Sequence, residues 1–151
     1  PRRASSSAGL FFSPIRFIRM LKYRLYFFFY YLCGISYVLA GVNHFVNPNF
    51  YLRIMPDYLP AHEALVALSG VAEILLGLGL VVRPKSQRLV WSAWGIILLL
   101  IAVYPANIYS YTHLAELGDP RATIDLIRLP FQLLFLWWAW VYTRPLPQRP
   151  E

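Results

Sequence analysis

Four apolar blocks, each long enough to cross a lipid bilayer as an α-helix, constrain this 151-residue chain more than any other feature. Such a helix needs roughly 20 residues. The blocks cover Arg24–Val46, Ala61–Val82, Arg88–Tyr111 and Ile124–Tyr142. Charged residues make up 14% of the chain, whereas a soluble domain carries about 25%. The sequence therefore predicts an all-α fold, a transmembrane four-helix bundle, and not a soluble globular domain.

The distribution of Lys and Arg predicts how this bundle is oriented. Most of these residues lie before the first block, between the second and third, and after the fourth. Four crossings place these three segments on one side, so the positive-inside rule puts both termini on the inner side. The stretch "NPNFYLRIMPDYLP" then forms a short outer loop between the first two helices. Because the net charge of +7 flanks apolar blocks, we expect no nucleic-acid binding.

We divide the chain into three segments: a basic N-terminal arm (1–23), a membrane domain (24–143) and a C-terminal tail (144–151). Two interpretations of the arm stay open. It is either the remnant of an organelle presequence or an inner-side arm that holds lipid head groups. The interpretation as a presequence remnant favours the mitochondrial inner membrane as the location of the protein, with a bacterial cytoplasmic membrane or a plastid membrane as alternatives.

Glu73 is a carboxylate inside the apolar second block, "SGVAEILLGLGL". Gly70, Glu73 and Gly77 share one helix face, and glycines beside a carboxylate let another helix or a flat ligand come close. Glu73 lies roughly 17 Å from the outer start of its helix at 1.5 Å per residue. An ionised carboxylate is costly there, so Glu73 must be protonated, paired or open to water. It is our candidate catalytic residue, as a proton carrier.

Polar residues on the other three blocks are candidate partners of Glu73. Arg128 shares a face with Asp125 on the fourth block and enters the bilayer from the same side as Glu73, so we expect a Glu73–Arg128 pair. The candidate contacts for a quinone or lipid head group are Arg128, Asn107, Gln132 and His44. The alternative is structural, because buried polar contacts also fasten membrane helices together. We expect no metal site, since the histidines lack ligand spacing.

Four stretches, "GVNHFVNPNFYLRIMPDYLP", "SGVAEILLGLGLVV", "YPANIY" and "RLPFQLLFLWWAW", together resemble the DoxX-like family of small membrane proteins. The similarity covers roughly Tyr31 to Tyr142. It implies a four-helix bundle whose shared pattern includes the positions Glu73, Asn107, Arg128 and Gln132. Some members are described as subunits of quinone-linked oxidoreductases acting on sulfur compounds. The basic N-terminal extension lies outside this pattern.

These observations support three hypotheses of function. The first is an accessory or structural subunit of a membrane electron-transfer complex of the respiratory type, with membrane lipids and other membrane subunits as partners. Its buried polar cluster would bind lipid or a quinone. The second is a quinone-linked oxidoreductase subunit that uses Glu73 and Arg128 in an outer-facing site within the membrane. The third is a membrane assembly factor or chaperone.

Overall fold

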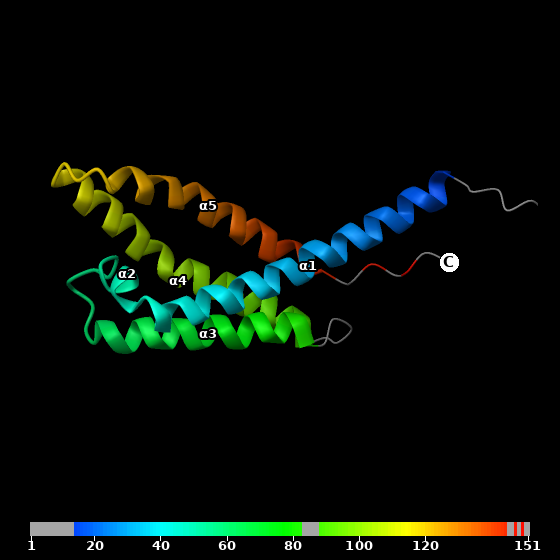
Figure 1. Cartoon of the computed structure of the whole chain (residues 1–151), viewed down its shortest axis with the longest axis horizontal. Helices are drawn as coiled ribbons and strands as arrows, with labels where there is room; N and C mark the ends of the chain where they lie inside the picture. Colours follow the sequence, from blue (N-terminus) through cyan, green and yellow to red (C-terminus); the bar gives the residue numbers. More distant parts are fainter. Residues whose placement is uncertain (1–13, 83–87, 145–146, 148, 150–151) are drawn as a thin grey trace, which may run out of the picture.

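The computed structural model describes residues 14–82, 88–144, 147 and 149, which form helices, turns and loops without any strand. Four helices are long and apolar enough to cross a membrane. They are α1 (Pro14–Val46), α3 (His62–Val82), α4 (Arg88–Glu116) and α5 (Ala122–Val141), and a fifth, α2 (Pro48–Leu52), is short (Figure 1). The predicted all-α architecture with four membrane-length helices is confirmed.

Two predicted helix boundaries differ from the structure by more than two residues. We expected the first helix to begin near Arg24, but α1 already begins at Pro14, a position where proline is well tolerated. No glycine or proline interrupts the stretch between them, so the helix continues through residues 14–23 of the predicted arm. The helix α4 extends to Glu116, five residues past the predicted end. The rest of the arm (1–13) and the connection 83–87 lie outside the described residues.

The helices α1 and α3 pack against each other as an antiparallel pair through four glycines. Gly41 faces Gly70, and Gly34 faces Gly77. A Cβ atom added to Gly41 would lie 2.5 Å from the carbonyl oxygen of Gly70, and one added to Gly77 would lie 2.7 Å from that of Gly34. The two backbones are therefore in direct contact, which only small residues permit.

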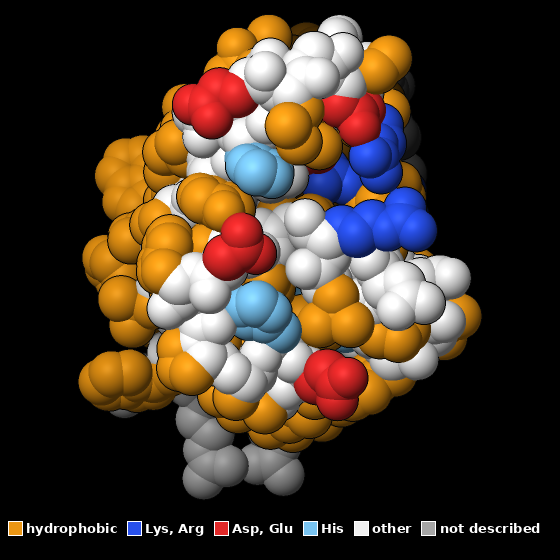
Figure 2. Space-filling view, turned by 90° about the vertical axis from the view of Figure 1, so that its left-hand side faces the viewer, with side chains coloured by type: hydrophobic (Ala, Val, Ile, Leu, Met, Phe, Trp, Pro, Cys, Tyr) orange, Lys and Arg blue, Asp and Glu red, His pale blue; other side chains and the backbone are white. Residues whose placement is uncertain are grey.

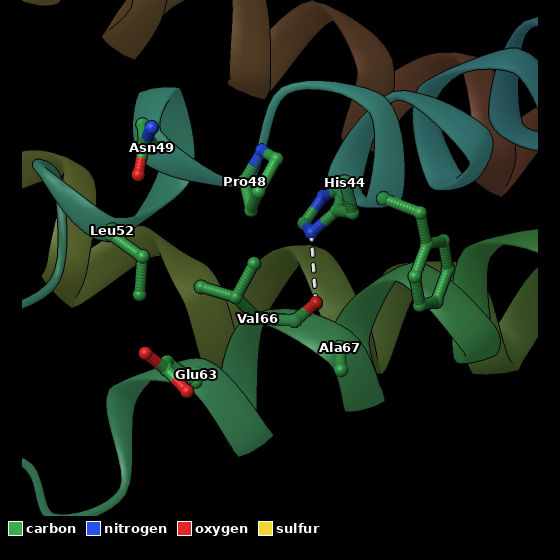
Figure 3. A pocket seen from close by; sticks show the side chains of 8 residues that line it. His44, Pro48, Asn49, Leu52, Glu63, Val66 and Ala67 are labelled. Atoms are coloured by element: carbon green, nitrogen blue, oxygen red, sulfur yellow. Dashed lines mark hydrogen bonds between the residues drawn. The ribbon is translucent and has the colours of Figure 1, made fainter.

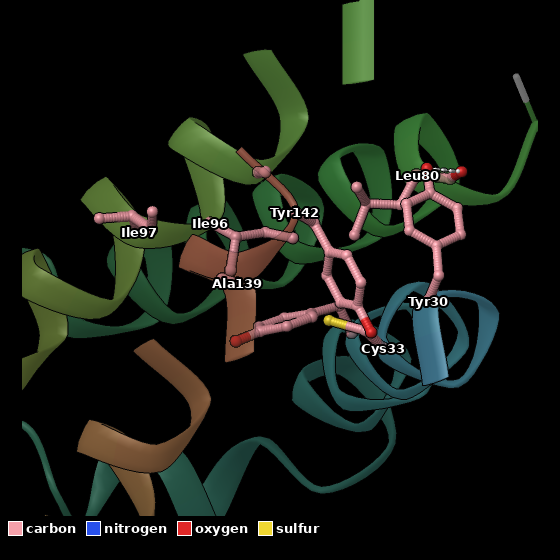
Figure 4. Packing of buried hydrophobic residues seen from close by; sticks show 9 residues of the cluster. Tyr30, Cys33, Leu80, Ile96, Ile97, Ala139 and Tyr142 are labelled. Carbon is pink, nitrogen blue, oxygen red and sulfur yellow. Dashed lines mark hydrogen bonds between the residues drawn. The ribbon is translucent and has the colours of Figure 1, made fainter. Parts of the chain in front are cut away.

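The second pair, α4 and α5, joins the first pair at one end of the molecule, which we call the tyrosine end. Here Tyr30 of α1 donates a hydrogen bond to the carbonyl oxygen of Leu80, 2.6 Å away. The Tyr142 ring, just after α5, packs edge-on against Tyr30 with the ring centroids 5.1 Å apart. Cys33 and Ile96 are fully buried in the same cluster (Figure 4). The apolar core of the molecule is thus concentrated at the tyrosine end.

At the opposite end, which we call the loop end, the two pairs diverge (Figure 1). This end carries residues 47–61, which include α2, and the turn 117–121 between α4 and α5. Charged and histidine side chains gather on its surface, among apolar ones (Figure 2). The four long helices therefore form a wedge that is closed at the tyrosine end and open at the loop end, and not a bundle of uniform width.

The turn between α4 and α5 fixes where α5 re-enters the wedge. Gly118 adopts a φ of 65°, a left-handed conformation that favours glycine and ends α4. The Arg121 guanidinium then contacts Asp119 and lowers the pKa of that carboxyl to about 2. Both members of this pair are charged at neutral pH, so they attract each other where α5 begins.

We predict that Gly41→Ala destabilises the protein, whereas Gly95→Ala on α4 is tolerated. The new methyl at position 41 meets backbone atoms of α3, but the one at position 95 meets the end of the flexible Leu76 side chain. Overpacking of this kind costs about 1–3 kcal/mol. Unfolding in mixed micelles with a rising fraction of denaturing detergent measures the difference. Equal stability of the two variants would contradict the close contact of α1 with α3.

Candidate functional site

The wedge encloses a cavity of about 740 Å³, which we call the wedge cavity. It is lined from α2, α3, α4 and α5, together with the last turns of α1. The structure brings all of the predicted site residues to this one cavity: His44, Glu73, Asn107, Arg128 and Gln132. Most of the remaining lining is apolar, with leucines and phenylalanines such as Leu68, Leu99, Phe131 and Phe135. Its size and lining are those of a small-molecule site.

Glu73 pairs with His44, and the expected Glu73–Arg128 pair is wrong. The Nε2 atom of His44 lies 3.6 Å from Oε1 of Glu73, with side chains 7% and 16% exposed. Helical side chains lean toward the N-terminus of their own helix. In the antiparallel α1–α3 pair, Glu73 therefore leans toward the loop end and His44 leans toward the tyrosine end. The two side chains thus lean toward each other.

The hydrogen bonds of His44 determine which of its ring nitrogens carries a hydrogen. Its Nδ1 atom is 2.9 Å from the carbonyl oxygen of Val66. A carbonyl oxygen only accepts, so Nδ1 carries the hydrogen. The hydroxyl of Ser69, 3.2 Å from Nδ1, donates to the same carbonyl at 2.9 Å.

Consequently Nε2 of His44 is the ring nitrogen that faces Oε1 of Glu73, 3.6 Å away, and the two groups form an ion pair when the imidazole is protonated. Both side chains lie at the edge of the wedge cavity. The second oxygen of Glu73, Oε2, is buried and has no hydrogen-bond partner among the described residues. It is thus the orphaned polar atom of the site.

The short helix α2 covers His44 from the loop end. The ring of Tyr51 stacks on the imidazole with centroids 3.6 Å apart, and Asn43 donates a hydrogen bond to the Tyr51 hydroxyl at 2.9 Å. A second cavity of about 320 Å³ lies between α2, α3 and the end of α1 (Figure 3). His44 lines both cavities, and Glu63 lines only the smaller one. Val66 also lines both cavities, so the imidazole and this residue lie between the small cavity at the loop end and the larger one.

Arg128 takes a different partner from the one we expected. Its guanidinium donates a hydrogen bond to Asp125 at 3.0 Å and lies 4.5 Å from the ring centroid of Phe50. Asp125 is almost fully buried and also accepts a hydrogen bond from Ser110 at 2.5 Å. A buried carboxylate needs a cationic or donor partner, and the arginine one turn along its own helix supplies it.

Asn107 and Gln132 connect α4 to α5 on the wall of the wedge cavity. Asn107 donates a hydrogen bond to the side-chain oxygen of Gln132 at 2.6 Å. Gln132 in turn donates to the carbonyl oxygen of Leu100 at 2.7 Å. This amide pair therefore has a structural role in the α4–α5 pair as well as a place on the cavity wall.

Sequence reasoning missed the residues that support the site: Ser69, Tyr51, Phe50 and Ser110. Ser69 packs beside His44, and Ser110 donates a hydrogen bond to Asp125. The other two belong to α2. A signal for α2 was present, because Asn47 followed by Pro48 is typical of a helix start. The predicted outer loop therefore contains a helical turn that places two aromatic rings against the site.

Comparison with known proteins adds one finding about family. Comparison with curated proteins and with solved structures gave no match. A family model described as Domain of unknown function (DUF8561) matches residues 33–143. This range contains every predicted residue of the wedge cavity and covers well over half of the chain. The chain therefore belongs to the family described as Domain of unknown function (DUF8561).

Proposed function

We propose that the protein binds the head group of a quinone, or a lipid with a head group of similar size, in the wedge cavity. The observation that carries this proposal is the cavity itself, about 740 Å³ in volume, where polar groups from four helices meet within an otherwise apolar lining. Such a combination suits an amphiphile, because the apolar lining accepts rings and methyl groups while a few polar groups hold oxygen atoms.

The residues of the cavity have distinct roles in this proposal. Arg128 and Asn107 donate hydrogen bonds to the oxygen atoms of the head group, and Gln132 holds Asn107 in place. The Glu73–His44 pair holds a proton beside the head group. A bound quinone would supply two-electron, two-proton redox chemistry, for which a proton held within the membrane is useful.

We further propose that the protein acts as an accessory subunit of a membrane electron-transfer assembly. A partner subunit would then supply the electrons, and the alternative is a subunit that takes part directly in quinone turnover. The resemblance to DoxX-like proteins supports both versions. In either case the distribution of basic residues supports an inner location of both termini and an outer location of the loop end. Of the membranes considered, the mitochondrial inner membrane stays the favoured one.

We predict that Ala72→Phe weakens binding of a short-tailed ubiquinone analogue about tenfold or more, which corresponds to ~1.4 kcal/mol. Ala72 lines the wedge cavity, so the added ring takes up the space of the head group. The matched control is Ala64→Phe on the same helix, where the side chain is exposed and lines neither cavity. Calorimetry on protein in lipid nanodiscs measures both affinities. Equal affinities in the two variants would place the ligand elsewhere.

We also predict that binding of the same analogue changes the protonation of the Glu73–His44 pair. A pH-sensitive dye in weakly buffered nanodiscs should report proton uptake or release with the wild type. Glu73→Gln and His44→Gln should abolish this signal, because each removes one member of the pair. Glu63→Gln is the matched control, since Glu63 is on the same helix but does not line the wedge cavity. A signal that persists in Glu73→Gln rules out the proton role.

The accessory-subunit proposal predicts that the protein migrates with partners after mild solubilisation of its native membrane. Native electrophoresis, followed by mass spectrometry of the band, should find it together with redox subunits. Substituting Ala72 by Phe should leave this association intact, because the cavity lies inside the wedge. Migration of the wild-type chain alone would contradict assembly into a larger complex, yet would leave the binding proposal standing.

A further inference from the structure

The helix α1 is much longer than the helix against which it packs. Gly34 lies against Gly77, and the Tyr30 hydroxyl binds the carbonyl oxygen of Leu80. In this antiparallel register the last residue of α3, Val82, lies opposite about residue 29 of α1. Residues 14–28, which we call the α1 extension, therefore project past the end of α3 by about 22 Å at 1.5 Å per residue.

Most of the α1 extension stands clear of the other helices (Figure 1). Only Tyr26 and Phe27 at its base pack against the core, and the first buried residue of α1 is Tyr30. The extension also lies outside the region that the family model matches, which begins at residue 33. It is thus an addition to the shared domain, and residues 14–25 contribute nothing to the core.

The α1 extension is amphipathic. At 100° per residue, Phe17, Ile18, Leu21 and Leu25 fall within an arc of about 100°, and all four side chains are exposed. The cations Arg16, Arg19 and Lys22 fall on the other side of the helix and are exposed as well. The helix α1 contains no acidic residue along its whole length. One side is therefore mainly apolar, and the other carries three cations, with Ile15 and Tyr23 among them and no acidic residue. A fourth cation, Arg24, borders the apolar arc.

The dimensions of the bilayer indicate where this segment lies. With its 21 residues, α3 is about 31 Å long, close to the ~30 Å thickness of the hydrocarbon. If α3 spans the hydrocarbon, the α1 extension begins at the membrane surface. Pointing straight into water, it would expose its apolar face. If α1 bends where it leaves α3, near residue 29, the segment can lie along the surface, bury that face among acyl chains and place its cations at the level of the phosphates.

We propose that the α1 extension lies on the membrane surface and binds anionic lipid head groups through Arg16, Arg19 and Lys22. These cations, without any acidic residue on α1, match the negative charge of such a surface. Continuity with a membrane-spanning helix keeps the segment at the bilayer. This inference does not rest on the function proposed for the wedge cavity, because no residue of the extension lines it.

Spin labels on single introduced cysteines can test this proposal in the full-length protein. Leu21→Cys reports the apolar face and Tyr23→Cys the cationic side. The only native cysteine, Cys33, is buried, so the wild type gives the labelling background. The protein is reconstituted in vesicles of phosphatidylcholine alone or of phosphatidylcholine with phosphatidylglycerol. Both leaflets have the same composition, so the orientation of insertion does not affect the result. Oxygen and a water-soluble nickel complex are the two relaxation reagents.

In anionic vesicles we expect the Leu21→Cys label to be accessible to oxygen and shielded from nickel, and the Tyr23→Cys label to show the reverse. The combined variant R16Q/R19Q/K22Q should lower the equilibrium constant for binding of the segment to the anionic surface. We expect a decrease of about fivefold per cation at low salt. The control is Arg53→Gln, which removes an exposed cation from the loop end and should have no effect.

Two results would overturn the proposal. If the Leu21→Cys label has the same accessibility in both kinds of vesicle and in the R16Q/R19Q/K22Q variant, anionic lipid is not the ligand. If that label is shielded from both reagents, the apolar face packs against protein, either a second copy of the chain or another subunit.

Discussion

The direct backbone contact between α1 and α3 is the constraint on which the rest of the structure depends. Four glycines let the two helices approach until their backbones are in direct contact. This contact places His44 against Val66 and within reach of Glu73. A wider separation would leave the carboxylate without its imidazole, in a part of the chain where lipid offers no hydrogen bond.

The apolar core and the polar cavity lie at different ends of the molecule. At the tyrosine end, aromatic rings and a backbone-directed hydroxyl fill the space between the two helix pairs. At the loop end the same pairs diverge, and polar groups line the space between them. Two of the polar contacts, Ser110 with Asp125 and Asn107 with Gln132, connect α4 to α5 inside one pair. These contacts hold α5, and with it Arg128, against α4 at the end where the pair diverges from α3.

Much of this arrangement could be predicted from the sequence, because hydrophobic block length and helical periodicity are local properties. The four membrane-length helices followed from them, and so did five residues of the cavity lining: His44, Glu73, Asn107, Arg128 and Gln132. The pairing inside the cavity did not, because it depends on the relative rotation and register of helices. Arg128 could reach either Glu73 or Asp125 on periodicity alone, and only the three-dimensional structure shows that Asp125 is its partner. The antiparallel order of α1 and α3 does predict that the side chains of Glu73 and His44 lean toward each other, because helical side chains lean toward the N-terminus of their own helix.

The wedge shape has a mechanical consequence. The two helix pairs meet at the tyrosine end and diverge from it, with the wedge cavity between them (Figure 1). A ligand in this cavity would therefore lie between the two pairs. Because α2 and the turn 117–121 lie farthest from the junction of the pairs, any change in the angle between the pairs would displace these two segments more than the rest of the molecule.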